Sequence, residues 1–414
     1  MSRVRALVAA VVAAALCAVG GATAAGQGGR PVFMVTGSLA ARELARVDAL
    51  TLAQASRAVT IGQPGNEYAS SPDGSTLAWV SWNGDFASLN LLDLHAMRTR
   101  IVPLARVGAA TTLTWLGGGR VLVLAEQPEG LRAFVVDPRA PRVVSARRLR
   151  AHFAEFANVA STKTGAVVLV RSLNGPPVQA ARLAVIGPSG APRIVAVAGV
   201  KIGAVRRKGG QRSYWEIHRP AVVADPAGEQ AYVVGAANEP VAAVDLRTGR
   251  VTYHRLRGLQ AQTTPVRVTD RHAIWMRPGV FAVVGFDEYA DATVRLGLKL
   301  VDTRTWRAKT VDPGADFAAL ADTLVVSQRN DLAGAVPEPG FTIAGYTLTG
   351  ATRFTLRLPD LTAPAEIASN GRYLYLVLHD AANTVVIVDE ATGAVAARLK
   401  APASLGLLLS PRRS

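Results

Sequence analysis

The sequence predicts an all-β protein, and three observations support that prediction. Short apolar runs end in Asp or Gly, a tight turn follows, and a second strand-like run leaves the turn. This unit recurs at steps of 42 to 58 residues, and no long helical periodicity follows the N-terminal segment. A repeat of this length, built from short strands and turns, is typical of a β-propeller. The repeat is marked by Asp48, Asp93, Asp137, Gly187, Asp245, Asp302, Thr347 and Asp389.

The N-terminus has the pattern of a secretory signal peptide. Two arginines precede an apolar run over residues 6–19, and Ala22-Thr23-Ala24 offers the small residues that a signal peptidase needs. We expect a signal peptide over residues 1–24, cleaved after Ala24 or Ala25. An uncleaved anchor is the alternative, because residues 6–25 reach the ~20 residues that span a bilayer.

Cleavage would leave a single β-propeller domain over residues 25–414. The one cysteine, Cys17, lies inside the signal, so the mature chain would be held by its core rather than by disulfides. We expect an extracytoplasmic protein, secreted or associated with the cell envelope, with no transmembrane segment after cleavage.

The chain is strongly basic, with a formal net charge of +16. Such a charge favours anionic partners, but most arginines are spread evenly along strands and turns. We expect the partner to be a protein or an anionic envelope polymer rather than a specific nucleic acid. We also expect a monomer.

The best-defined module runs from Asn66 to Leu104. A short strand around residues 68–70 reaches the turn Ser71–Gly74, and three further strands are predicted over 76–82, 87–94 and 98–104. Four short strands separated by turn residues are the spacing of an antiparallel blade.

The two ends of the mature chain predict one shared blade. Residues 31–62 supply only a second, third and fourth strand, whereas residues 402–411 supply a first strand and then stop. Since an incomplete blade would leave an exposed edge, we expect Ser404–Leu409 to pair with Val32–Thr36 and close the first blade.

This count gives eight four-stranded blades. Seven is the alternative, because the steps of 58 and 57 residues on either side of Asp245 are irregular.

The chain resembles the superfamily of extracytoplasmic repeat β-propellers that includes the YVTN-type, Tol-type and quinoprotein-like groups. The resemblance lies in the turn Ser71–Gly74 and in the Val-Asp-x-x-Thr-Gly turns at Asp245 and Asp389. Scaffolds, lactonases and dehydrogenases share this fold, so the resemblance implies architecture rather than activity. Tyr253 and Ala397 stand where the quinoprotein motif has tryptophan, which argues against a quinone cofactor.

Other catalytic and metal signatures are not found in the sequence. It has no Gly-x-Ser-x-Gly motif, and its six histidines are scattered singly. Asp287, Glu288 and Asp291 form one acidic cluster that could hold a cation, although a solvated hairpin tip explains it better. We therefore expect no catalytic residue, no metal and no cofactor.

The strongest binding candidate is the basic and aromatic segment from Arg206 to Arg219. Its cations would attract phosphates or carboxylates, and its aromatic rings offer stacking faces. We expect an exposed, mobile loop, because Gly209 and Gly210 disfavour a regular element. The alternative is a solvated connector whose tryptophan packs on the next blade. The predicted ligand-binding residues are Arg206, Arg207, Lys208, Arg212, Tyr214 and Trp215.

Together these features favour a non-enzymatic binding or scaffold module for a partner protein or an anionic envelope ligand. The alternative is a propeller enzyme of the lactonase or hydrolase type. Its site would lie at the mouth of the central channel and would draw residues from several blades, so it would leave no local motif.

Overall fold

In the computed structural model the described part of the chain is all β and contains no helix. It therefore contains no helix that could cross a membrane. The predicted signal peptide over residues 1–24 lies outside the described residues, as does Ser404. The described residues are 29–38, 41–62, 64–83, 86–106, 111–153, 159–209, 212–256, 265–330, 340–359, 366–378, 384–402 and 405–410.

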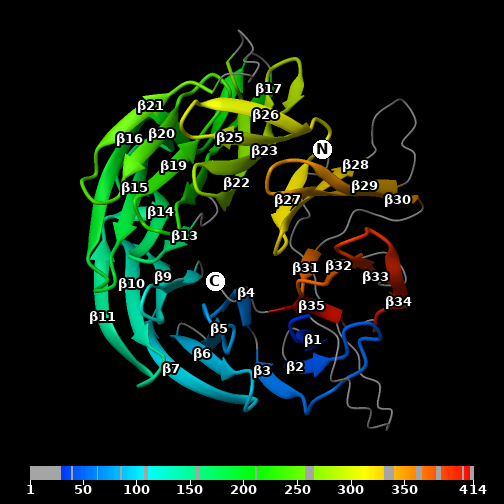
Figure 1. Ribbon diagram of the computed structural model, residues 1–414. Helices are drawn as coiled ribbons and strands as arrows, with labels where there is room; N and C mark the ends of the chain where they lie inside the picture. Colours follow the sequence, from blue (N-terminus) through cyan, green and yellow to red (C-terminus); the bar gives the residue numbers. More distant parts are fainter. Residues whose placement is uncertain are drawn as a thin grey trace.

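Six sheets are separate blades of four antiparallel strands, arranged around a common centre (Figure 1). In five of them the strands follow one another along the chain, as the turn spacing predicts. The first blade contains β1 (Val32–Ser38), β2 (Ala41–Val47), β3 (Val59–Gly62) and β35 (Leu405–Leu409). The second contains β4 (Pro64–Ser70), β5 (Thr76–Asn83), β6 (Phe86–Asp93) and β7 (Arg98–Arg106). The third contains β8 (Thr111–Leu116), β9 (Arg120–Gln127), β10 (Gly130–Asp137) and β11 (Arg142–Leu149). The others contain β18 (Ala221–Ala224), β19 (Gln230–Val234), β20 (Val241–Asp245) and β21 (Val251–His254); β27 (Phe317–Leu320), β28 (Leu324–Asn330), β29 (Gly340–Thr347) and β30 (Thr352–Pro359); and β31 (Glu366–Ser369), β32 (Tyr373–Val377), β33 (Thr384–Asp389) and β34 (Val395–Lys400).

The remaining strands form one eleven-stranded sheet. It contains two meanders, β13-β14-β15-β16 and β22-β23-β25-β26, which β17 joins by pairing antiparallel with β16 and parallel with β22. Its strands are β12 (Ala151–Phe153), β13 (Val159–Thr162), β14 (Gly165–Ser172), β15 (Val178–Ile186), β16 (Pro192–Gly209), β17 (Arg212–Arg219), β22 (Val268–Arg277), β23 (Val280–Glu288), β24 (Thr293–Arg295), β25 (Leu298–Asp302) and β26 (Arg307–Asp312).

This sheet corrects the predicted blade count. We expected eight separate four-stranded blades, or seven, whereas six are separate and the strands between them are fused. The cause is β17, an extra strand that falls within the irregular 58-residue step between Gly187 and Asp245.

The two ends of the chain share the first blade, as predicted. β35 pairs antiparallel with β1, with Phe33 opposite Leu409 and Thr36 opposite Leu405. The sheet order is β3-β2-β1-β35, so the C-terminal strand lies next to β1 and brings the blade to four strands. Leu405 and Leu408 of β35 are buried and pack with Val32 and Met34 of β1.

The aspartates that mark the repeat hold the turns between strands. Each accepts hydrogen bonds from the backbone N–H groups two and three residues later; for Asp245 these are Arg247 at 2.9 Å and Thr248 at 2.6 Å. These bonds keep the pKa of Asp245 below its ordinary value. The same pattern occurs at Asp48, Asp93, Asp137, Asp302 and Asp389.

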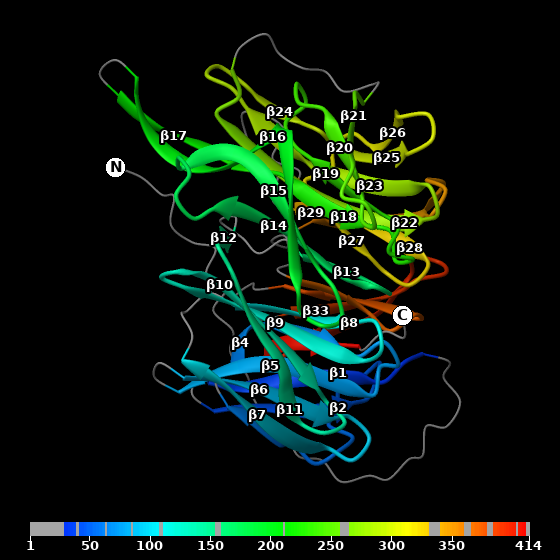
Figure 2. The same ribbon diagram turned by 90° about the vertical axis from the view of Figure 1, so that its left-hand side faces the viewer.

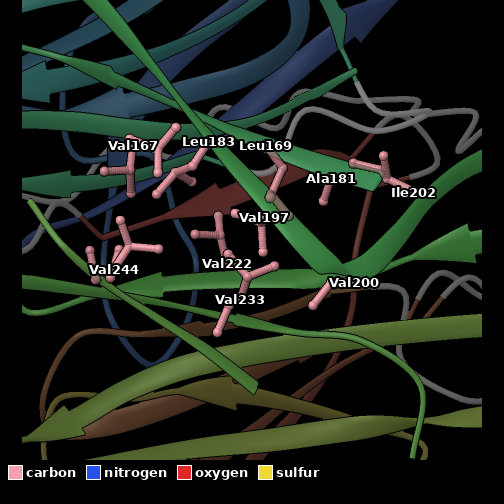
Figure 3. Packing of buried hydrophobic residues seen from close by; sticks show 14 of the residues in the cluster. Val167, Leu169, Ala181, Leu183, Val197, Val200, Ile202, Val222, Val233 and Val244 are labelled. Carbon is pink, nitrogen blue, oxygen red and sulfur yellow. The ribbon is translucent and has the colours of Figure 1, made fainter. Parts of the chain in front are cut away.

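The core lies between the faces of neighbouring sheets. Val167, Leu183 and Val197 from β14, β15 and β16 pack against Val222 and Val233 from β18 and β19 (Figure 3). Alternating apolar residues on each strand face these contacts, which is how stacked antiparallel sheets bury their side chains.

Removing the C-terminal strand should destabilise the whole domain. Deletion of residues 401–414 would expose the edge of β1 and remove the packing of Leu405 and Leu408 in the core. We therefore expect the protein to aggregate or to lose its cooperative melting transition. Leu408→Ala should lower the free energy of unfolding by about 2 to 5 kcal/mol. Deletion of residues 411–414, which keeps β35, is the control. A 401–414 deletion that melts like the full chain would contradict this prediction.

Candidate binding hairpin

The segment from Arg206 to Arg219 is a regular β-hairpin, not the irregular loop that we expected. The end of β16 and residues 212–218 of β17 pair in register from Gly203 opposite His218 to Gly209 opposite Arg212. This hairpin, residues 203–219, projects from the body at the upper left of Figure 2. Gly209 ends β16 beside the tip, so it does not interrupt either strand.

A glycine lets the hairpin leave the sheet. The register between β15 and β16 shifts between Ala180 and Ala181, and beyond this shift Gly203 lies opposite Val178. Gly203 has a φ of +114°, and a Cβ there would lie 1.9 Å from the carbonyl oxygen of Pro177. Only glycine allows this close approach. β16 can therefore continue past its blade into the hairpin.

One face of the hairpin combines exposed cations with an exposed aromatic ring. Arg206 lies opposite Trp215, and Lys208 lies opposite Ser213, so all four residues share this face. Trp215 is 54% exposed, and Arg206 and Lys208 are exposed as well. Arg206 donates to Ser213 Oγ at 2.7 Å, so its guanidinium is held against the neighbouring strand β17. We call Arg206, Lys208 and Trp215 the basic-aromatic face.

The opposite face is used by contacts within the protein. Arg207 donates to Glu216 Oε2 at 2.6 Å, and the other oxygen of Glu216 lies 3.2 Å from His218 Nε2. Burial opposes ionisation of Glu216, but these two partners outweigh it, so the pKa of Glu216 lies below its ordinary value. Tyr214 lies on this face too, with the guanidinium of Arg267 4.4 Å from its ring centre.

His218 is the buried end of this chain of contacts. Its side chain is 2% exposed, and Nδ1 has no hydrogen-bond partner. Burial lowers the pKa of His218, whereas the contact with Glu216 acts in the opposite direction. No group of three or more His, Cys, Asp or Glu residues that could hold a metal occurs in the described part of the chain, which includes five of the six histidines.

The base of the hairpin is fixed by a buried ion pair. Arg271 of β22 contacts Asp287 of β23 at 2.7 Å, and both side chains are at most 3% exposed. Asp287 also accepts from Thr269 Oγ1 and from the backbone N–H of Ala237, while Arg271 donates to the carbonyl of Gly235. These bonds tie the β19–β20 turn to β22 and β23.

The acidic cluster is only in part the solvated hairpin tip that we expected, because Asp287 is buried whereas Asp291 lies in the exposed turn between β23 and β24. Asp287 is neutralised by Arg271, and the backbone carbonyl of Glu288, the last residue of β23, accepts from Arg267 N at 2.7 Å. Asp291 is exposed in the following turn. The three residues do not converge, because they fall on a strand, at a strand end and in a turn.

Of the predicted ligand-binding residues, the hairpin brings Arg206, Lys208 and Trp215 onto one face. Arg207 and Tyr214 lie on the other face, held by Glu216 and Arg267. The backbone of Arg212 pairs with Gly209 at the tip, and its side chain is outside the described part. The predicted packing of Trp215 on the next blade is not observed, because more than half of its surface is exposed.

Sequence reasoning missed a further carboxylate near the hairpin, that of Glu239. It lies in the β19–β20 turn and accepts hydrogen bonds from the backbone N–H groups of Ala236 at 3.1 Å and Lys201 at 3.2 Å. Burial nevertheless raises the pKa of Glu239 to about 6. Glu239 thus links β16, at the root of the hairpin, to the neighbouring blade.

Comparison with known proteins relates this chain to others through its fold alone. No protein-family model matches it, and no curated protein matches its sequence. Solved structures do match. A dihydro-heme d1 dehydrogenase, NirN, aligns with a TM-score of 0.57 and 16% identity over 92% of this chain and 75% of its own.

Two further structures lead to the same conclusion. Apo AztD from Citrobacter koseri aligns with a TM-score of 0.56 and 12% identity, covering 92% of this chain and 97% of its own. A eukaryotic initiation factor aligns with a TM-score of 0.55 and 10% identity, covering 92% of this chain and 88% of its own. A dehydrogenase and an initiation factor thus share this architecture, so the matches define the class, a β-propeller, and no function.

The carboxyl of Glu239 should make stability depend on pH. Because its pKa in the folded protein, about 6, lies above the ordinary value of 4.5, the folded state binds this proton more tightly than the unfolded state. Its contribution to the free energy of unfolding should therefore grow as the pH falls from 7 to 5. The parent-minus-variant difference for Glu239→Gln should grow over the same range, measured by urea unfolding.

His218 changes stability with pH in the opposite direction to Glu239, and subtracting the free energy of unfolding of the variant from that of the parent cancels its effect. Because burial lowers the pKa of His218, its contribution to stability decreases as the pH falls below 6.5, in parent and variant alike. Glu229→Gln, at an exposed position in the same blade, is the control for loss of a carboxylate. A pH-independent difference for Glu239→Gln would contradict the prediction.

Proposed function

We propose that the protein is an exported, non-enzymatic binding module whose hairpin, residues 203–219, contacts an anionic polymer of the cell envelope. The observation that carries this proposal is the basic-aromatic face. A tryptophan that is 54% exposed stands beside two exposed cations on a projecting element. Large exposed aromatic residues on rigid elements are frequent binding anchors, because their side chains lose little conformational entropy on binding.

The rigidity of the base supports the same proposal. Pairing of β17 with both β16 and β22 fixes the direction of the hairpin, and the Arg271–Asp287 pair fixes the strands that it leaves. The face is therefore preorganised, which lowers the entropic cost of binding. Cations would attract carboxylate, sulfate or phosphate groups, and the indole would stack on a sugar ring.

Export rests on the N-terminal signal pattern, and a monomeric state remains part of the proposal. The enzymatic alternative requires ionisable groups that are available to a substrate. The ionisable groups that gather at the base of the hairpin instead have protein partners: Asp287 contacts Arg271, Thr269 and Ala237, and Glu239 accepts from Ala236 and Lys201. At the hairpin, this arrangement favours binding over catalysis.

Neutralising the hairpin should weaken polyanion binding, with heparin as the probe. Arg206→Gln combined with Lys208→Gln should raise the Kd about 2- to 30-fold, since each exposed charge contributes about 0.2 to 1 kcal/mol. Adding Arg207→Gln should add less, because Glu216 already neutralises Arg207. Arg142→Gln with Arg148→Gln, exposed on β11, is the control for net charge. Parent-like binding by Arg206→Gln/Arg207→Gln/Lys208→Gln/Arg212→Gln would refute the proposal.

Trp215→Ala should separate recognition from packing. Because the ring is largely exposed, the melting temperature should hardly change, as expected for a substitution within about 0.5 kcal/mol. The Kd for heparin should rise more than about fivefold, since an anchoring ring contributes over about 1 kcal/mol. Trp215→Tyr, which keeps an aromatic face, should recover most of the affinity. A drop of several degrees in melting temperature without a change in Kd would assign Trp215 to packing.

A further inference from the structure

A cavity with a volume of about 1000 Å³ lies at the opposite end of the molecule from the hairpin. It is lined by the β4–β5, β8–β9 and β13–β14 turns, and by Ser410 after β35. β16 begins at Pro192, which pairs with Ile186 close to the β13–β14 turn, and runs from there toward the hairpin. The two features therefore lie at opposite ends of the same strands.

Close contacts between turns build one wall of this cavity. The backbone N–H of Lys163 donates to the carbonyl of Pro226 at 2.8 Å, which joins the β13–β14 turn to the β18–β19 turn. A Cβ on Gly117 would lie 1.6 Å from the carbonyl oxygen of Lys163, so the β8–β9 turn rests directly on the β13–β14 turn. The Lys163 backbone is thus fixed on both sides, while its side chain is exposed and lines the cavity.

The same β8–β9 turn leaves part of the cavity lining free of side chains. Gly118 and Gly119 have φ values of +82° and +77°, and a Cβ added to either would meet nothing within 4 Å. Both residues line the cavity. A ligand could therefore approach the backbone here closely, as in other glycine-rich turns that bind anions.

The charge of the lining is positive. Arg100, Arg139 and Lys163 come from three different sheets, and all three are exposed. Asp73 is the one acid among the described lining residues. Its Oδ1 accepts from Ser71 Oγ at 2.5 Å and from Ser75 N at 3.0 Å, so this carboxylate is used to hold its own turn.

The remaining lining offers hydroxyl groups and one aromatic surface. Thr114 and Ser161 can donate to ligand oxygens, whereas Ser75 Oγ already donates to Asp73 Oδ1 at 2.8 Å. Trp115 lines the cavity too, and its Nε1–H donates to the carbonyl of Ala69 at 3.0 Å, so the ring supplies an apolar wall rather than a donor. Cations and hydroxyls that line one cavity beside an apolar surface are typical of small-ligand sites.

The geometry points to a second binding site in this cavity, for a small organic anion that carries at least two carboxylate or phosphate groups. Three cations from separate sheets can contact more than one anionic group at once, and about 1000 Å³ is at the upper end of ordinary ligand pockets. This site is independent of the hairpin, since none of its lining residues belongs to residues 203–219.

The test is calorimetric titration of the full mature chain with citrate and, separately, pyrophosphate. We expect at least one probe to bind with a Kd below about 1 mM. The preferred probe tells carboxylate from phosphate. Arg100→Gln/Arg139→Gln/Lys163→Gln should weaken binding at least tenfold. Arg142→Gln/Arg148→Gln/Lys309→Gln, which removes three exposed cations elsewhere, should change it less than threefold.

Ser161→Trp gives a second variant that fills the cavity without changing its charge, and it should weaken binding to the same extent. Arg206→Gln/Lys208→Gln should leave citrate and pyrophosphate binding unchanged, so failure of the hairpin proposal and failure of this one are distinguishable. The inference is overturned if neither probe binds the parent at millimolar concentration. It is also overturned if Ser161→Trp, with a parent-like melting temperature, binds as the parent does, because the cations would then act only as surface charge.

Discussion

The buried pair of Arg271 and Asp287 is the interaction on which the projecting hairpin depends. Two charges with side chains at most 3% exposed are costly to bury, and breaking such a pair typically costs about 3 to 5 kcal/mol. Here the remaining hydrogen-bonding atoms reach Gly235, Ala237 and Thr269, so desolvation is offset by a complete set of partners. The pair therefore fixes β22, and β22 in turn supplies the edge on which β17 lies parallel.

That parallel pairing explains why two meanders merge into one sheet. An exposed strand edge invites pairing, and the usual solution is to cover or shorten it. In this protein β17 covers the edges of both β16 and β22 through its Gly203–His218 and Ile217–Val268 registers. The same strand carries Trp215 outward. The strand that pairs with two sheet edges thus also presents the face that we propose for binding.

Sequence reasoning succeeded where local chemistry decides the structure. Asp245 and Asp389 were predicted to end a strand at a tight turn, and each carboxylate accepts hydrogen bonds from the N–H groups two and three residues later, which hold that turn. The pairing of the chain ends followed from a missing strand at one end and an extra one at the other. The regular hairpin was missed because we gave Gly209 and Gly210 more weight than the strand-forming run Tyr214-Trp215-Glu216-Ile217.

Features that depend on contacts between distant residues could not be predicted in this way. The parallel partner of Ile217 is Val268, and nothing in either segment specifies the other. The same holds for the cavity. Gly117 to Gly119 is plain turn chemistry in sequence, and only the position of Lys163 from the next sheet makes it a wall. Dispersed arginines become a local charge when a ring of sheets brings their turns together, so even spacing along this chain does not imply even distribution in space. Within a chain of net charge +16, two groups of cations therefore gather at opposite ends of the strands. At the hairpin they stand on an exposed face, for which we propose a polymer, whereas at the turns they line a cavity, for which we propose a small molecule.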